Sequence, residues 1–235
     1  MNRTEDLKKG FLRQLWSRKA PWYIKVMRTS ALTMAGIVSL PYFFAALPGD
    51  PIPETQLEPL REFYQSTVDY DDIKLHSSIF GDFLLKVTDS DASTYGSTII
   101  VSRADKQKMI KQSDFQEYVL AHELGHVRQF AHNDINLFQT VYEKFNARVK
   151  GKDSISLYEY SLLEDKDWED YGIEQQASIL ADYYNITRGL PPLCLTDGIY
   201  GEERKALYQK VLAGFLKERD ATRPAANVKP QVPSV

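Results

Sequence analysis

The stretch that decides the fold is YVLAHELGHVRQ, residues 118–129, which contains the pattern HExxH at His122, Glu123 and His126. On an α-helix, residues four apart lie on nearly the same face, so both imidazoles can bind one metal ion. Glu123 then lies beside the ion rather than on it, where a carboxylate can act as a general base. Imidazole suits zinc, and a catalytic zinc needs a third protein ligand and one open position. The stretch therefore predicts a helix that supplies two ligands of a zinc ion.

A third ligand is offered by Glu174, 48 residues after His126, within GIEQQASILAD at residues 172–182. A carboxylate from a second helix completes a His-His-Glu donor set, which is one of the sets that catalytic zinc uses. The alternative is His132, which has the spacing of the third histidine in HExxHxxGxxH sites. Two observations oppose it, because Gln129 stands where that pattern needs glycine and all four methionines precede the motif. Glu174 is therefore the preferred ligand.

Small residues predict that the two ligand-bearing helices pack closely. Gly125 lies inside the first helix, where glycine costs about 1 kcal/mol relative to alanine, and a closely approaching backbone would explain its presence. Ala177 and Ser178 continue the face of Glu174 on the second helix. Asp182, about 80° around that helix from Glu174, is a candidate acceptor for an imidazole N–H.

Hydrophobic periodicity predicts an α+β fold, mainly helical, with a small β-sheet and an apolar helix before the metal-binding domain. Ser113 and Gln116 form a capping box at the start of the HExxH helix. Alternating or β-branched stretches indicate strands, and apolar residues at helical spacing indicate helices. The predicted helices are 57–68, 114–130, 137–149 and 173–187, and the predicted strands are 73–76, 97–101 and 154–160.

Composition and charge exclude several classes of protein. The chain has 235 residues, of which 43% are hydrophobic and 26% charged, and this composition rules out disorder for most of it. The net charge of −3 gives no basic excess, so we expect no nucleic-acid partner. The single cysteine, Cys194, cannot form an internal disulfide or a thiolate zinc site, and we expect it to be a small buried hydrophobic side chain.

The N-terminal region differs from the rest of the chain. Residues 1–28 contain eight basic and two acidic side chains, a net charge of +6, which leaves −9 for the other 207 residues. Residues 29–49 carry no charge over 21 positions, which is long enough to cross a bilayer as a helix. We expect a membrane anchor here, with a signal peptide or a soluble helix as alternatives. The predicted divisions are this region at 1–49, the metal-binding domain at 50–220 and a disordered, Pro-containing tail at 221–235.

The segments HELGHVRQ and GIEQQASILADYY together resemble the zincin metallopeptidase domains at the C-terminus of some VgrG proteins, spike components of bacterial type VI secretion systems, and of related stand-alone proteins. The resemblance covers residues 57–190, and the segment 68–76 is similar to the strand that opens those domains. It implies that His122, His126 and Glu174 bind zinc and that Glu123 is the catalytic glutamate. This chain has no spike domain and adds the basic and apolar N-terminal stretch to the pattern.

The activity that the resemblance implies is peptide-bond hydrolysis by a zinc-activated water, with Glu123 as general base. In zincins an edge strand above the metal-binding helix pairs with the substrate backbone, and we expect residues 98–101 to be that strand. Candidate donors of a hydrogen bond to the oxyanion are Tyr171, Tyr183, Tyr184 and Arg188.

A protein or peptide is the expected substrate, and secretion machinery or an immunity protein is a candidate partner. We expect the protein in the bacterial membrane or cell envelope, with its catalytic domain outside the cytoplasm, or else secreted. Two other functions stay open: a non-catalytic, zinc-stabilised and membrane-tethered binding module, and a tethered interaction protein without metal. Glu123 opposes the zinc-stabilised module, because a structural site has no use for an unliganded carboxylate, and zinc analysis would separate the interaction protein without metal from the other interpretations.

Overall fold

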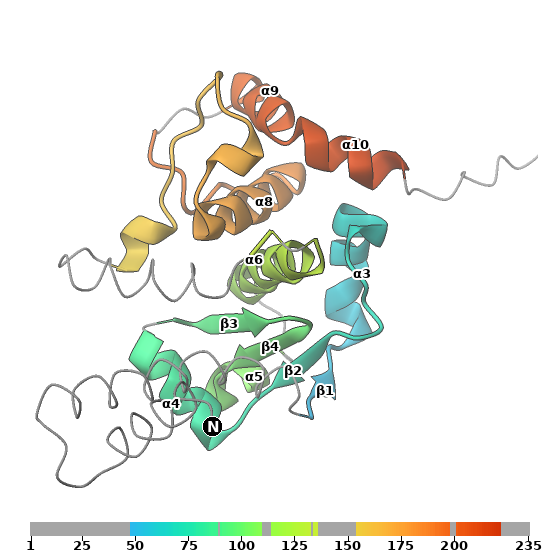
Figure 1. Ribbon diagram of the computed structural model, residues 1–235, viewed down its shortest axis with the longest axis vertical. Coiled ribbons are helices and arrows are strands. Elements are labelled where there is room, and N and C mark those ends of the chain that lie inside the picture. The colour runs from blue at the N-terminus through green and yellow to red at the C-terminus, as the bar shows by residue number, and fades with distance from the viewer. Residues whose placement is uncertain are drawn as a thin grey trace, which may run out of the picture. The chain divides into compact units, whose positions relative to one another are not determined.

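The helix that contains the HExxH motif is α6, Asp114–Ala131, which lies between the β-sheet and a second long helix, α8, Ile173–Thr187 (Figure 1). The expected α+β architecture is present, with most residues helical and one small mixed sheet. Both helices agree with the predicted bounds to within one residue. The computed structural model describes residues 48–88, 90–109, 114–132, 134–135, 154–197 and 201–221.

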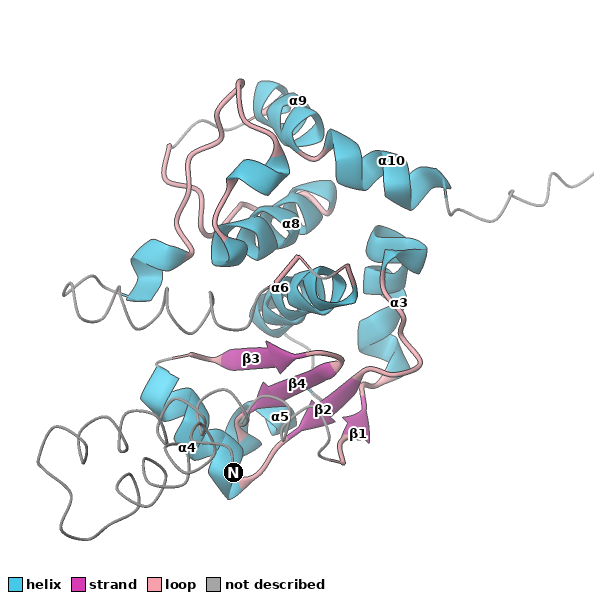
Figure 2. Cartoon of the chain, viewed as in Figure 1, coloured by secondary structure: helices cyan, strands magenta, loops and turns pink. Residues whose placement is uncertain are grey.

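Four short strands form the sheet in the order β1-β2-β4-β3 (Figure 2). Strand β2, Lys74–His76, is parallel to β4, Thr98–Val101. The two outer strands are antiparallel to their neighbours: β1, Asp50–Pro51, pairs with β2, and β3, Ala92–Tyr95, pairs with β4. The predicted strands at 73–76 and 97–101 are confirmed to within one residue, whereas β1 and β3 were not predicted.

Strand β4 is internal, because β2 and β3 flank it, so the prediction that residues 98–101 form the edge strand is wrong. The edge beside α6 is formed by β3, which turns into β4 through Gly96-Ser97. Gly96 has a φ of 62°, a left-handed conformation that glycine adopts without steric cost. A two-residue Gly-Ser connection between ASTY and TIIV is a hairpin signal, and this signal was available in the sequence.

Both faces of β4 are covered by helices. Ile99 and Val101 belong to the main hydrophobic core on the side of α6. On the other face, a Cβ on Gly81 of α4, Ile79–Thr88, would lie 3.1 Å from the Ile100 side chain. The β-branched residues of β4 are therefore fully buried, as expected for the central strand of a covered sheet.

Helix α3, Glu54–Tyr64, packs beside α6 (Figure 1). It begins three residues before the predicted 57–68 helix and ends earlier, because Gln65 takes a positive φ of 49° and starts a short 3₁₀ turn. The buried Tyr64 hydroxyl donates a hydrogen bond to the Ala121 carbonyl oxygen at 2.7 Å. This contact fixes α3 against the helix that bears the motif.

The segment 154–160, predicted as a strand, is instead a 3₁₀ helix at Ser154–Leu157 followed by an isolated bridge between Tyr160 and Leu195. The alternation does not place the apolar residues of this segment on one buried face. Ile155 is exposed, whereas Tyr160 is buried and donates a hydrogen bond to the Asp182 carboxylate. The remaining described helices were not predicted: α5, Arg103–Met109; a 3₁₀ turn, Trp168–Asp170; α9, Glu202–Val211; and α10, Ala213–Ala221.

Several predictions fall on residues outside the described part of the chain. These are the N-terminal apolar stretch up to residue 47, the capping residue Ser113, the helix at 137–149 and the tail from residue 222 onward. Over the described ranges, none of the helices is both long and apolar enough to span a bilayer.

Candidate metal centre

Helices α6 and α8 touch through their smallest residues. A Cβ on Gly125 would lie 3.2 Å from the Cα of Ala177 and 3.3 Å from its Cβ, so the two backbones meet closely at this point. Ser178 and Ala181 on the same face of α8 are completely buried. The close approach inferred from Gly125 is confirmed, and it places Glu174, one turn before Ser178, opposite the histidines.

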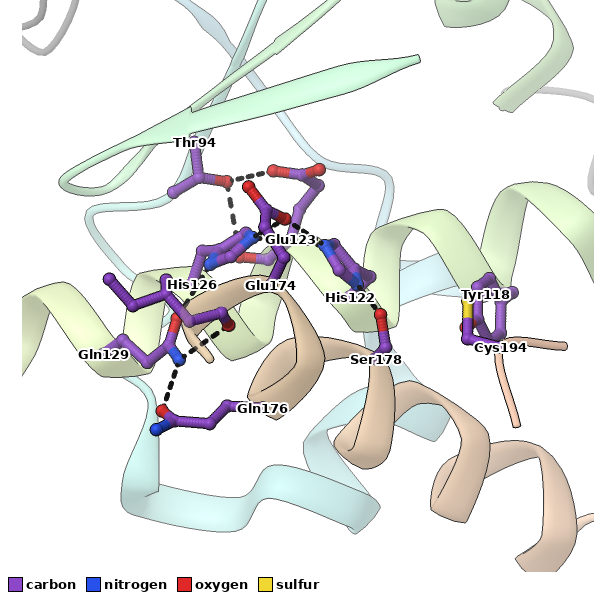
Figure 3. A network of polar contacts seen from close by, with 11 residues as sticks. Thr94, Tyr118, His122, Glu123, His126, Gln129, Glu174, Gln176, Ser178 and Cys194 are labelled. Carbon is purple, nitrogen blue, oxygen red and sulfur yellow. Dashed lines mark hydrogen bonds and ion pairs between the residues drawn. The ribbon is translucent and has the colours of Figure 1, made fainter. Parts of the chain in front are cut away.

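Three donor atoms converge between the two helices (Figure 3). Glu174 Oε2 lies 3.3 Å from His122 Nε2 and 3.1 Å from His126 Nε2, and the two Nε2 atoms are 3.1 Å apart. Donors at about 2.0–2.1 Å from a tetrahedral zinc ion are about 3.3 Å from one another. All three residues are buried. The set therefore has the spacing that a shared ion needs, and the three residues can hold a metal ion.

His126 sits between a carboxylate and an amide. Its Nε2 faces Glu174, and its Nδ1 lies 2.7 Å from Gln129 Oε1. Burial by itself would lower the pKa of His126, but the adjacent Glu174 carboxylate raises it above the usual value of 6.5. In the sequence, Gln129 stands out only because it occupies the glycine position of the HExxHxxGxxH pattern. Its position three residues after His126, on the same helical face, was the signal for this contact.

His122 has a different neighbour from the one predicted. Its Nδ1 lies 3.4 Å from Ser178 Oγ, at the long end of hydrogen-bond distances. Asp182 does not accept from an imidazole, so that prediction is wrong. The Asp182 carboxylate instead accepts from the Tyr160 hydroxyl at 2.6 Å and from the Leu193 backbone N–H at 2.6 Å. The rotation of about 80° along α8 turns Asp182 away from the histidines, toward these segments and toward Tyr118 of α6.

Glu123 stands next to the cluster without joining it. Its Oε2 accepts a hydrogen bond from the Thr94 hydroxyl at 2.6 Å, and Thr94 belongs to the edge strand β3 (Figure 3). Among the described residues, no other side chain is recorded as donating to this carboxylate. The Glu123 side chain is buried and lies close enough to His126 to help raise the pKa of that histidine. A buried carboxylate and three residues that could hold a metal ion therefore lie side by side next to the edge strand.

The four candidate oxyanion donors are engaged elsewhere. Tyr183 packs in the aromatic core against Phe63. The Tyr184 hydroxyl and the Arg188 guanidinium both bind the same carboxylate on α6, that of Glu117. The Tyr171 hydroxyl donates to a backbone carbonyl ten residues upstream. None of these contacts involves the cluster, so the structure does not bring the four residues to it.

Tyr158 is the aromatic residue that the structure places beside the cluster. Its ring centroid is 5.5 Å from that of His122, and the side chain is half-buried. No motif singles out Tyr158, because the alternation over residues 154–160 favours a strand.

Two other singled-out side chains lie away from the cluster. His132, the alternative third ligand, is exposed at the end of α6, with Nε2 at 3.3 Å from Glu218 Oε1. Cys194 is half-buried rather than fully buried, and its Sγ accepts from the Tyr118 hydroxyl at 3.3 Å. Neither residue contributes to the candidate metal site.

Comparison with known proteins gives a structural likeness only. No family model matches the chain, and no curated protein matches it. The fold is similar to that of the effector domain of Pseudomonas aeruginosa VgrG2b, with a TM-score of 0.51 and 19% sequence identity. The match covers 77% of this chain and 95% of that domain. The chain therefore has an effector-domain-like fold built around a buried His-His-Glu group.

Proposed function

We propose that this chain is a zinc-dependent metallopeptidase, in which His122, His126 and Glu174 hold the ion and Glu123 is the general base. A zinc ion bound there would lower the pKa of a water toward 7 and polarise the carbonyl of a peptide bond. The chain's own residues would do the rest: Glu123 takes a proton from the water and passes it to the leaving amine.

The observation that supports catalysis most directly is the position of Glu123. It is one residue from a candidate ligand, yet its carboxylate is bound by Thr94 rather than placed in the donor set. A site that only fastened two helices together would leave this buried carboxylate without a role. A hydrolytic site needs a base in this place, which favours the peptidase over a zinc-stabilised binding module.

The substrate side of the proposal rests on β3. This strand is at the edge of the sheet and is linked to the base through Thr94, so an extended peptide that pairs with β3 would pass over the cluster. We propose β3, in place of β4, as the strand that binds the substrate backbone. A protein or peptide in extended conformation is the proposed substrate class.

The likeness to an effector domain supports a role as a bacterial effector that acts on envelope proteins. The uncharged stretch at 29–49 favours a membrane-anchored form, with secretion as the alternative. Fractionation of cells into cytoplasm, membrane and medium, read with an antibody to the chain, would separate these locations.

The test of the activity compares the full-length wild type with Glu123→Gln, using fluorescein-labelled casein and measuring zinc content by mass spectrometry. We expect one zinc per chain in both proteins, hydrolysis by the wild type and a loss of at least about 100-fold in Glu123→Gln. Glu58→Gln, on the exposed side of α3, is the matched control and should keep full activity. Equal activity of Glu123→Gln and the wild type would contradict the assignment, and zinc binding without hydrolysis would favour the binding module.

A further inference from the structure

Two glutamine side chains connect His126 to the loop that precedes α8. Gln129 Oε1 lies 2.7 Å from His126 Nδ1, and Gln129 Nε2 donates to Gln176 Oε1 at 2.8 Å (Figure 3). Gln176 Nε2 in turn donates to the Tyr171 carbonyl oxygen at 2.8 Å. Gln129 also donates to the Ile173 carbonyl oxygen at 3.2 Å. A continuous chain of hydrogen bonds therefore runs from a candidate metal ligand to the protein backbone.

The Tyr171 carbonyl determines which atom donates and which accepts in each of these hydrogen bonds. A backbone carbonyl oxygen can only accept, so the amide group of Gln176 must present its nitrogen to Tyr171 and its oxygen to Gln129. Gln129 must then present its nitrogen to Gln176, and the carbonyl of Ile173 demands the same orientation independently. The only atom left to face the imidazole is Gln129 Oε1, which is an acceptor.

An acceptor opposite Nδ1 requires the proton of the neutral imidazole to be on Nδ1. The lone pair is then on Nε2, the atom that lies 3.1 Å from Glu174 Oε2 and 3.1 Å from His122 Nε2. A second ring nitrogen held by a fixed acceptor is the usual means by which a protein orients a metal-binding histidine. Here the acceptor is an uncharged amide whose own orientation is imposed from another helix.

We infer that Gln129 and Gln176 are positioning residues that form an amide relay, polarised by the Tyr171 and Ile173 carbonyls, which fixes His126 as an Nε2 ligand of the metal. The inference rests on the metal site of the proposed function, but it does not depend on peptide hydrolysis. Gln129 is completely buried and reaches from α6 to α8, so the same side chain sets the tautomer of His126 and the position of α8 beside it.

The relay is tested by the zinc affinity of the full-length protein, measured by competition with a chromophoric chelator. We expect Gln129→Met, which keeps the side chain's length and removes both hydrogen-bonding groups, to weaken zinc binding by about 10- to 100-fold. Gln176→Met, which does not touch the imidazole, should weaken it by a smaller factor, about threefold or more, because the Ile173 carbonyl alone would then hold the orientation of Gln129. Gln56→Met is the matched control, since Gln56 is a buried glutamine on α3 outside the relay, and it should leave the affinity unchanged.

A second measurement covers the case in which a variant does not fold. Long-range ¹H–¹⁵N correlation spectra of the zinc-loaded wild type should show the proton of His126 on Nδ1 and the metal on Nε2. A proton on Nε2, unchanged zinc affinity in Gln129→Met, or an equal loss in Gln56→Met would each overturn the relay. A wild type without zinc affinity would overturn both the relay and the proposed site. Normal zinc affinity and the expected variant effects without casein hydrolysis would refute the peptidase and leave the relay intact.

Discussion

Gly125 on α6 and Ala177 on α8 meet so closely that a Cβ added at position 125 would require its neighbours to move by a few tenths of an ångström. A Cβ at position 125 would lie 3.2 Å from the Ala177 Cα, closer than nearly all ordinary carbon contacts, and 3.5 Å from the Leu180 side chain. The donor atoms of the candidate metal site come from these same two helices, so the separation of the helices at this point sets the spacing of the ligands.

Larger side chains at position 125 should therefore weaken metal binding by moving the helices apart. We expect Gly125→Val to destabilise the fold by about 1–3 kcal/mol, as overpacking of a core does, and to lower zinc affinity. The exchange Gly125→Ala with Ala177→Gly moves the methyl group to the other helix and should bind zinc more tightly than Gly125→Ala alone. Thermal unfolding and chelator competition measure the two effects. Equal zinc affinity of Gly125→Val and the wild type would refute the link between packing and the site.

Removal of the Glu174 carboxylate should weaken zinc binding. Glu174→Ala deletes the only acidic member of the donor set, and we expect zinc affinity to fall by at least about 100-fold. The exposed Glu202→Ala on α9 is the control and should bind zinc as the wild type does. Isothermal titration calorimetry reads the result, and unchanged affinity in Glu174→Ala would remove this residue from the ligand set.

The effect of zinc on stability should increase with pH. The Glu174 carboxylate raises the pKa of His126 above 6.5, so in the metal-free protein the protonated imidazole contributes stability that is fully present below 6.5 and is lost as the pH rises through the higher folded-state value. Zinc must displace that proton, which lowers its affinity by about tenfold per pH unit below that value.

The measurement is the shift in melting temperature on addition of zinc between pH 5.5 and 8.5. We expect the shift to be smallest at the acid end, and His132→Gln, a change far from the cluster, to show the same dependence. A shift that does not vary with pH would contradict the assignment of His126 as the proton-binding ligand.

Substitution of Thr94 should lower kcat without changing the zinc content. The Thr94 hydroxyl holds one oxygen of the Glu123 carboxylate at 2.6 Å, and without it the base would lose its fixed orientation. We expect Thr94→Val to lower kcat on casein by about 10-fold or more at unchanged zinc content, and Thr94→Ser to restore it. Thr67→Val removes another buried threonine hydroxyl with a 2.6 Å hydrogen bond, to the Tyr64 carbonyl, and should leave kcat unaffected. Equal losses in the two valine variants would indicate a general packing defect.

Asp182 should be important for stability rather than for the site. Its carboxylate has no exposed surface and accepts hydrogen bonds from the Tyr160 hydroxyl and from the backbone N–H groups of Leu193 and Cys194. Asp182→Ala removes the acceptor of two backbone N–H groups and one of the two hydroxyl partners of Tyr160, and we expect a loss of about 3 kcal/mol or more. Urea unfolding checks this, with the exposed Asp220→Ala as control. A loss below that of a typical surface substitution would show that the segment around Leu193 is not held by Asp182.

The parts of the fold that follow from local periodicity could be predicted, and the parts set by distant contacts could not. Helices α6 and α8 are 18 and 15 residues long, and the candidate ligands on them could be identified from spacing. Strand β3 has only four residues, and β4 is internal because it also pairs with β2, which lies more than 20 residues earlier in the chain. The contact of Thr94 with Glu123 spans 29 residues and has no local signal.

The errors have the same origin. Asp182 lies on the expected helix, but its direction is decided by the segment around Leu193, which no periodic pattern describes. The segment 154–160 alternates as a strand would, yet within the described residues only Tyr160 finds a bridging partner. Gln129 was the exception, because its contact with His126 is local and could have been inferred from a spacing of three residues.

The donor set is divided between two helices, and Glu174 follows His126 by 48 residues. An unfolded chain therefore has no preformed site for the ion, and the three donors lie together only when the helices are packed at Gly125 and Ala177. Assembly of the three donors is thus coupled to folding, so a bound ion would stabilise the packed helices and not the unfolded chain.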